Sequence, residues 1–153
     1  LQRDTKVTLL ETPDVNQVEA FLRSLFKYAD FAPEIFINTA ILLKRLLEKT
    51  GWHLRPTNWR ILVILSLRIT LKMEDRPLLY TSDIRELYPL FNAADLLHLE
   101  RVYLRMVDYH CVITLEQYKS ALLEIYAAVR SSNHRDTNLS ARRHEQRTQK
   151  TQQ

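Results

Sequence analysis

The longest segment with apolar residues on nearly every side of a helix covers residues 59–72. Within it Leu65, Leu67 and Ile69 alternate with polar residues, a period that is also typical of a half-buried strand. Length favours a helix, because no Gly or Pro interrupts residues 58–76 and the run exceeds an ordinary strand. A helix that is apolar all round is covered by other helices. The pattern therefore predicts a buried central helix.

Two helices are predicted before this segment. Residues 15–29 repeat apolar side chains at helical spacing, and Asp14 can cap the start of that helix. Pro33 suits the first position of a second helix, which we expect to run to Glu48 before Gly51 ends it. The segment between Gly51 and the central helix is expected to be a loop.

Three helices are predicted after the central one, over residues 82–88, 93–109 and 115–130. Asn92 is the expected cap of the second of these. Thr114 and Gln117 have the spacing of a capping box for the third.

Composition agrees with an all-α fold. One glycine and five prolines in 153 residues leave little from which to build β-hairpins or glycine-rich phosphate loops. The apolar runs are far shorter than a membrane span, and Cys111 is the single cysteine, which suits a reducing compartment. We expect an intracellular protein. Because the sequence begins with Leu1, we also expect it to be a piece of a longer protein, whose missing segments could carry a membrane or targeting signal.

Basic and acidic residues are unevenly distributed along the chain. The excess of basic over acidic residues, 22 against 18, arises in the last stretch, where the composition is polar and Arg-rich. The body is therefore near neutral, which argues against a nucleic-acid surface on it. We expect an N-terminal arm over 1–14, a folded domain over 15–130, and a basic polar tail over 131–153 that is disordered or a solvated helix.

No arrangement of residues indicates an active site or a metal centre. His53, His98, His110 and Cys111 lack the spacing of familiar metal ligands. Adjacent carboxylates at the end of the central helix point apart, and no nucleophile–base pair or phosphate loop is present. We therefore expect no enzyme activity, no metal and no cofactor.

The order of these segments resembles the cyclin box. The sequence is most similar to cyclin Y and to the phosphate-pathway cyclins of fungi. The similarity covers residues 15–127. Four stretches carry it, and they are Val18 to Phe26, Leu42-Leu43-Lys44-Arg45-Leu46-Leu47, Pro56-Thr57-Asn58-Trp59-Arg60 leading to Lys72, and Leu99-Glu100-Arg101 running to Tyr109. The resemblance implies a cyclin-box five-helix fold around a buried third helix, with one extra C-terminal helix.

The same resemblance implies a regulatory subunit of a cyclin-dependent protein kinase, with a role in the cell cycle or another signalling response. In the family, residues that match Lys72 and Glu100 meet in space and bond backbone groups beside the kinase C-helix. Neighbouring apolar side chains cover that helix. The positions of this sequence that match the surrounding surface are Ile69, Met73, Glu74, Leu104 and Tyr109.

Some alternatives stay open at this point. Without the family, Lys72 is an ordinary cation at a helix C-terminus and Glu100 a solvated flank residue. Arg45 is expected to be structural, pairing with an acidic neighbour. The alternative function is a cyclin-fold scaffold that binds protein or nucleic acid without a kinase. On the kinase hypothesis we expect no small-molecule substrate and no specific nucleic acid.

Overall fold

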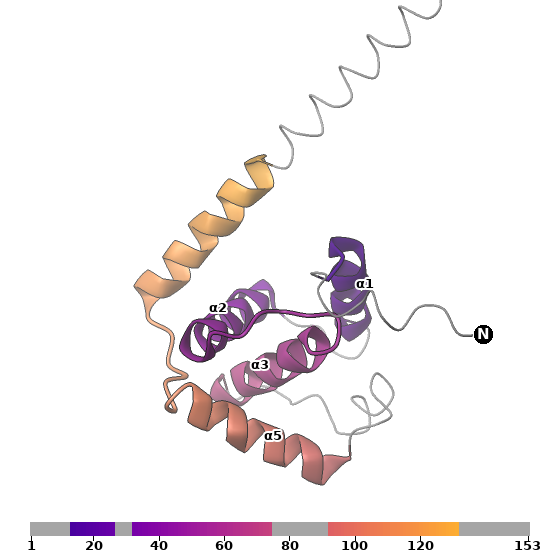
Figure 1. The fold of residues 1–153 in the computed structure, drawn as a ribbon. Coiled ribbons are helices and arrows are strands. Elements are labelled where there is room, and N and C mark those ends of the chain that lie inside the picture. The colour runs from indigo at the N-terminus through magenta and orange to yellow at the C-terminus, as the bar shows by residue number, and fades with distance from the viewer. Residues whose placement is uncertain (1–12, 27–31, 75–91, 132–153) are drawn as a thin grey trace, which may run out of the picture. The chain divides into compact units, whose positions relative to one another are not determined.

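The computed structural model describes residues 13–26, 32–74 and 92–131. All regular structure in these residues is helical: they form five helices and no strand (Figure 1). The helices are α1 (Val15–Phe26), α2 (Pro33–Thr50), α3 (Trp59–Met73), α5 (Ala93–Met106) and a helix over 115–131. The predicted all-α class is confirmed. The helix predicted over 82–88 lies outside the described residues.

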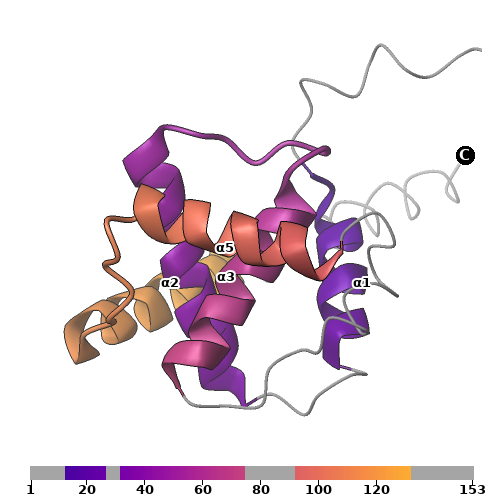
Figure 2. The ribbon, with the colours of Figure 1, turned by 90° about the horizontal axis from the view of Figure 1, so that it is seen from below.

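The central segment is a helix, as its length predicted. Eleven of the 15 residues of α3 are buried, including every residue from Leu62 to Leu71. Figures 1 and 2 show α2 and α5 packed against it. Because burial continues around the whole helix, the alternation of Leu65, Leu67 and Ile69 with polar residues does not separate a buried face from a solvated one.

Burial on all sides follows from the position of α3 between two apolar clusters. The first cluster joins α3 to α1, α2 and the start of α5, and its buried members are Leu25, Ile35, Ile64, Leu67, Leu71 and Leu96. The second joins α3 to α2, to the end of α5 and to the segment after it, and its buried members are Leu42, Leu46, Leu62, Leu65, Ile69, Tyr103, Val107 and Cys111. Helix α3 is therefore the element that the other helices of this unit share.

The aromatic residue at the start of α3 connects it to α1. The ring of Trp59 is 1% exposed and meets the ring of Phe21 edge-on, with centroids 5.1 Å apart. The guanidinium of Arg60 lies 4.5 Å from the centroid of the Trp59 ring, within the range of a cation–π contact.

The helix ends follow the predicted signals in most cases. Gly51 ends α2 in the left-handed region, with φ 68°, and its N–H donates to the carbonyl of Leu47 at 2.9 Å. This arrangement is typical of glycine after a helix. Asn92 caps α5 by accepting from the N–H of Asp95 at 2.9 Å. The predicted caps at Gly51 and Asn92 are both confirmed.

Helix α5 ends at Met106, three residues earlier than predicted. Asp108 and Tyr109 have φ values of 52° and 58°, which leave the right-handed helical region. The N–H of Tyr109 donates to the carbonyl of Leu104 at 2.8 Å and closes the turn. Neither residue is a glycine, so the sequence contained no ordinary signal for this turn.

Arg45 of α2 holds the segment that follows this turn. Its Nη1 donates to the carbonyl of His110 and, at 3.2 Å, to that of Val112. These bonds give Arg45 a structural role, and they go to backbone carbonyls, whereas the prediction named an acidic neighbour.

The chain divides into two compact units between Ile113 and Thr114. In the second unit the structure describes the helix over 115–131, which carries the predicted capping box. The N–H of Gln117 donates to Thr114 Oγ1 at 3.2 Å, and the N–H of Thr114 donates to Gln117 Oε1 at 3.0 Å. The predicted arm over 1–14 and tail over 131–153 fall almost entirely outside the described residues, so those boundaries stay predictions.

Candidate functional site

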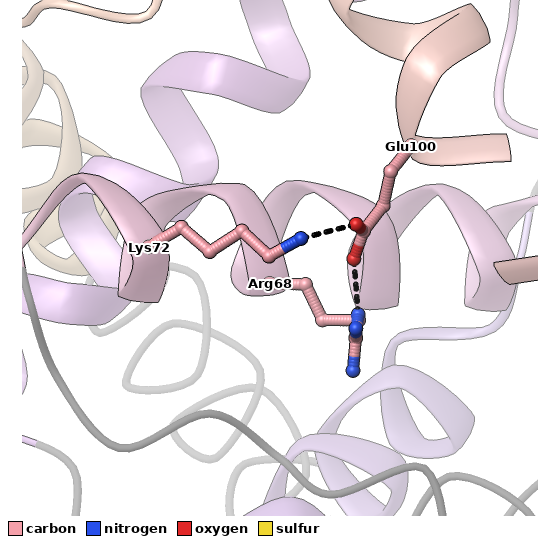
Figure 3. A network of polar contacts seen from close by, with 3 residues as sticks. All are labelled: Arg68, Lys72 and Glu100. Atoms are coloured by element: carbon pink, nitrogen blue, oxygen red, sulfur yellow. Dashed lines mark hydrogen bonds and ion pairs between the residues drawn. The ribbon is translucent and has the colours of Figure 1, made fainter. Parts of the chain in front are cut away.

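A buried carboxylate lies between two cations where α3 faces α5. Glu100 of α5 is 3% exposed. Its Oε1 accepts a hydrogen bond from Arg68 Nε, and its Oε2 accepts one from Lys72 Nζ (Figure 3). We call Arg68, Lys72 and Glu100 the charge cluster. It brings together residues 28 and 32 positions apart in the sequence.

The spacing on α3 explains why both cations reach one carboxylate. Arg68 and Lys72 are four residues apart, so their side chains lie on the same side of the helix. The Arg68 side chain is 10% exposed and lies inside the core, whereas that of Lys72 is 41% exposed. Lys72 is therefore the member of the charge cluster that a partner molecule can reach.

The electrostatics of Glu100 are set by these neighbours. Burial by itself raises the pKa of Glu100, but the hydrogen bonds from Lys72 and Arg68, together with their charges, outweigh it. The pKa of Glu100 is lowered as a result. Glu100 stays ionised at neutral pH and is a poor candidate for a general acid.

The charge cluster is bordered by apolar side chains. Met73, next to Lys72, is 51% exposed. On α5, Leu97 and Leu104 lie three residues before and four residues after Glu100, so they are its neighbours on the helix surface. Leu97 is 47% exposed and Leu104 is half-buried. Apolar side chains that are exposed or half-buried thus follow Lys72 on α3 and flank Glu100 on α5.

Two of the predicted site residues occupy other surroundings than expected. Ile69 is 3% exposed and belongs to the second core cluster, so it supports the site from within. Glu100 is 3% exposed, so the alternative that it is a solvated flank residue is wrong. The carboxylate is buried because Arg68 and Lys72 supply the bonds and charge that water would otherwise supply.

The other two predicted residues lie at the ends of helices. Glu74 follows α3 and is half-buried, and its Oε1 accepts a hydrogen bond from Asn38 Nδ2 of α2. Tyr109 is 66% exposed in the turn after α5. Its backbone N–H donates to the carbonyl of Leu104 at 2.8 Å, so it belongs to the turn that closes the end of α5.

Arg68 and Leu97 are the site residues that the sequence analysis missed. An arginine in the middle of a helix that is apolar all round needs a buried carboxylate as partner, because an unpaired charge is rarely buried. That requirement was a usable signal for Arg68. Leu97 had no comparable signal, since exposed leucines are common on protein surfaces.

The arrangement suits binding better than chemical catalysis. Lysine has three N–H donors, and the single bond to Glu100 leaves two for acceptors on a partner.

Among the residues that the structure describes, no three His, Cys, Asp or Glu side chains form a group that could hold a metal ion. Over residues 13–26, 32–74 and 92–131, no helix has the length and apolar character needed to cross a membrane.

Comparisons with known proteins do not assign the chain to a family or a known fold. No family model matches the chain, and no solved structure matches it significantly.

Proposed function

We propose that this chain is a regulatory subunit of a cyclin-dependent protein kinase, without catalytic groups of its own. The observation that carries the proposal is the ion pair between Lys72 and Glu100. The resemblance to cyclins implied that these two positions meet, although they are 28 residues apart. The buried third helix that the same resemblance implied gives the proposal further support.

The charge cluster suggests a different role in partner binding for Lys72 and for Glu100. In the family both residues bond the partner, but here Glu100 is 3% exposed and both of its oxygens bond to cations of this chain. Lys72 is then the group that donates to carbonyl oxygens beside the kinase C-helix. Glu100 holds the ammonium in place. Met73, Leu97 and Leu104 exclude water around the bond and thereby strengthen it.

Activation follows from holding that helix. A protein kinase is active when a lysine of its sheet pairs with a glutamate of its C-helix, which requires the C-helix to lie inward. A subunit that binds the outside of the C-helix stabilises this position. The chain needs no catalytic residue for that effect.

The test is binding and activation of purified cyclin-dependent kinases that lack their own regulatory subunit. Each kinase is mixed with the full chain, and complex formation is measured by gel filtration and activity by phosphate transfer to a protein substrate. The proposal expects at least one kinase to form a complex and gain activity. If no kinase of the panel forms a complex, the proposal is wrong and the scaffold function is favoured.

A further inference from the structure

The outer face of α5 carries apolar side chains next to the charge cluster and basic side chains further from it. Leu97 and Leu104 border Glu100, and Arg101 and Arg105 lie further round the same face of the helix. Both arginines are exposed. We call this surface, together with the exposed end of α3, the α5 edge, and its members are Lys72, Met73, Leu97, Arg101, Leu104 and Arg105.

The charge of the α5 edge has one sign. Arg68 and Lys72 together outweigh the single carboxylate of Glu100, so the charge cluster has an excess of one positive charge. Glu100 does not present its carboxylate outward, because it is 3% exposed. Glu74, which follows Met73, is half-buried and accepts a hydrogen bond from α2. The three charged side chains of the α5 edge are all cations.

We infer that the α5 edge binds an amphipathic helix whose apolar face is bordered by carboxylates. The inference rests on the proposed function, because it names the chemistry of the kinase helix that the same site holds. Met73, Leu97 and Leu104 cover the apolar side chains of that helix. The carboxylates pair with Arg101 and Arg105, while Lys72 bonds the backbone of the helix as proposed above, and a helix bordered by cations is repelled.

Arg68 determines this preference without touching the partner. By bonding Oε1 of Glu100 it occupies the carboxylate that could otherwise accept an N–H from the partner or repel a partner carboxylate. The site then offers donors and positive charge only. This makes Arg68 a positioning residue for partner choice.

The chain contains a pair of probes for this test, since it has two methionines. Met73 lies on the α5 edge and is 51% exposed, whereas Met106 is half-buried against the second core cluster. The full chain labelled at the methionine methyl groups gives one NMR signal for each. The ligand is a synthetic stapled helix of about five turns, with leucines on one face and glutamates bordering them. A matched helix has glutamine in place of each glutamate.

We expect the glutamate helix to shift the Met73 signal in a saturable way and to leave the Met106 signal in place. The glutamine helix should bind about tenfold more weakly, because it lacks the charges that complement the α5 edge. Raising the salt from about 0.05 M to about 0.5 M should weaken the glutamate helix selectively. Arg101→Gln should weaken it too, whereas the control Lys49→Gln, at an exposed lysine of α2, should not.

Equal affinity for the two helices, or no shift at Met73 with either, overturns the inference. These results can be distinguished from a failure of the proposed function. A chain that activates a kinase but prefers the glutamine helix refutes the inference alone. A chain that prefers the glutamate helix but binds no kinase refutes the proposed function alone.

Discussion

Arg68 of α3 donates a hydrogen bond to the buried carboxylate of Glu100 on α5, so a charged pair joins the two helices inside the core. Their side chains are 10% and 3% exposed. Both charges are largely removed from water, so each needs a bonded partner of opposite charge, and Lys72 is a second such partner for Glu100. The pair therefore has consequences for stability as well as for the binding site.

Replacing Glu100 should destabilise the fold. Glu100→Gln keeps the size of the side chain but removes the buried negative charge to which both Arg68 and Lys72 bond, which should cost about 3 kcal/mol or more in free energy of unfolding. The measurement is urea unfolding followed by the fluorescence of the buried Trp59. The matched control is Asp108→Asn, because Asp108 is an exposed carboxylate paired with Lys49, and it should change stability little. Equal effects of the two substitutions would show that Arg68 is compensated in another way.

Stability should also depend on pH through Glu100. Burial opposes ionisation, but the bonds and charges of Lys72 and Arg68 outweigh it, so the pKa of Glu100 is lower in the folded state than in the unfolded chain. A lowered pKa contributes stability that is fully present above the unfolded value of about 4.3 and is lost as the pH falls through the folded value. The melting temperature of the chain, relative to that of Glu100→Gln, should therefore be highest near neutral pH and should decrease in acid. A difference that is constant from pH 7 down to about 3 would contradict this linkage.

Ser66 and Tyr103 form a second buried polar contact between α3 and α5, with 2.9 Å between their oxygens. Ser66 Oγ also donates to the carbonyl of Leu62, at 2.8 Å. Tyr103→Phe therefore leaves the serine with a partner and should cost about 1 kcal/mol in free energy of unfolding. Ser66→Ala removes the partner of a tyrosine hydroxyl that is buried, and it should cost more, about 2 kcal/mol. Urea unfolding of both variants gives the order, and the reverse order would contradict this account of the contact.

The C-terminal end of α2 depends on the conformation of Gly51. A Cβ atom at this position meets no atom within 4 Å, so a side chain fits. Its φ of 68° is nevertheless unfavourable for alanine, and Gly51→Ala should lower the free energy of unfolding by about 1 kcal/mol. Gly51→Asn should cost less, because asparagine tolerates the left-handed region better. If alanine and asparagine have equal effects in thermal unfolding, the backbone conformation is not the cause.

Much of the fold could be predicted because its signals are local. The caps at Gly51 and Asn92 and the apolar pattern of α3 each lie within one short segment. The turn at Asp108 and Tyr109 could not be predicted, because its left-handed residues are stabilised by bonds to α5 and not by glycine.

The site could be predicted only in part. The proximity of Lys72 and Glu100 came from the resemblance to cyclins, and the ion pair agrees with it. The burial of Glu100 could not be predicted, since it depends on Arg68, which is distant in sequence and close only in the folded chain.

The proposed function depends most on Lys72, and the chain offers a matched control for it. Lys49 and Lys72 both lie near the end of a helix, both pair with a carboxylate, and their side chains are 44% and 41% exposed. Lys72→Ala leaves Glu100 with Arg68 as partner but removes one of its two bonds, so it should melt somewhat below Lys49→Ala, and both variants should stay folded at the temperature of the binding measurement. Any difference between them in kinase binding then reports on the surface and not on folding.

The most direct measurement uses a cyclin-dependent kinase that the unmodified chain activates. Its dissociation constant is measured for the unmodified chain, for Lys49→Ala and for Lys72→Ala. Loss of a charged donor from a desolvated contact should cost about 2 kcal/mol, so Lys72→Ala should bind roughly 30-fold more weakly. Lys49→Ala should bind as the unmodified chain does. Equal binding by all three folded proteins would contradict the proposal that Lys72 is the contact through which this chain holds a kinase.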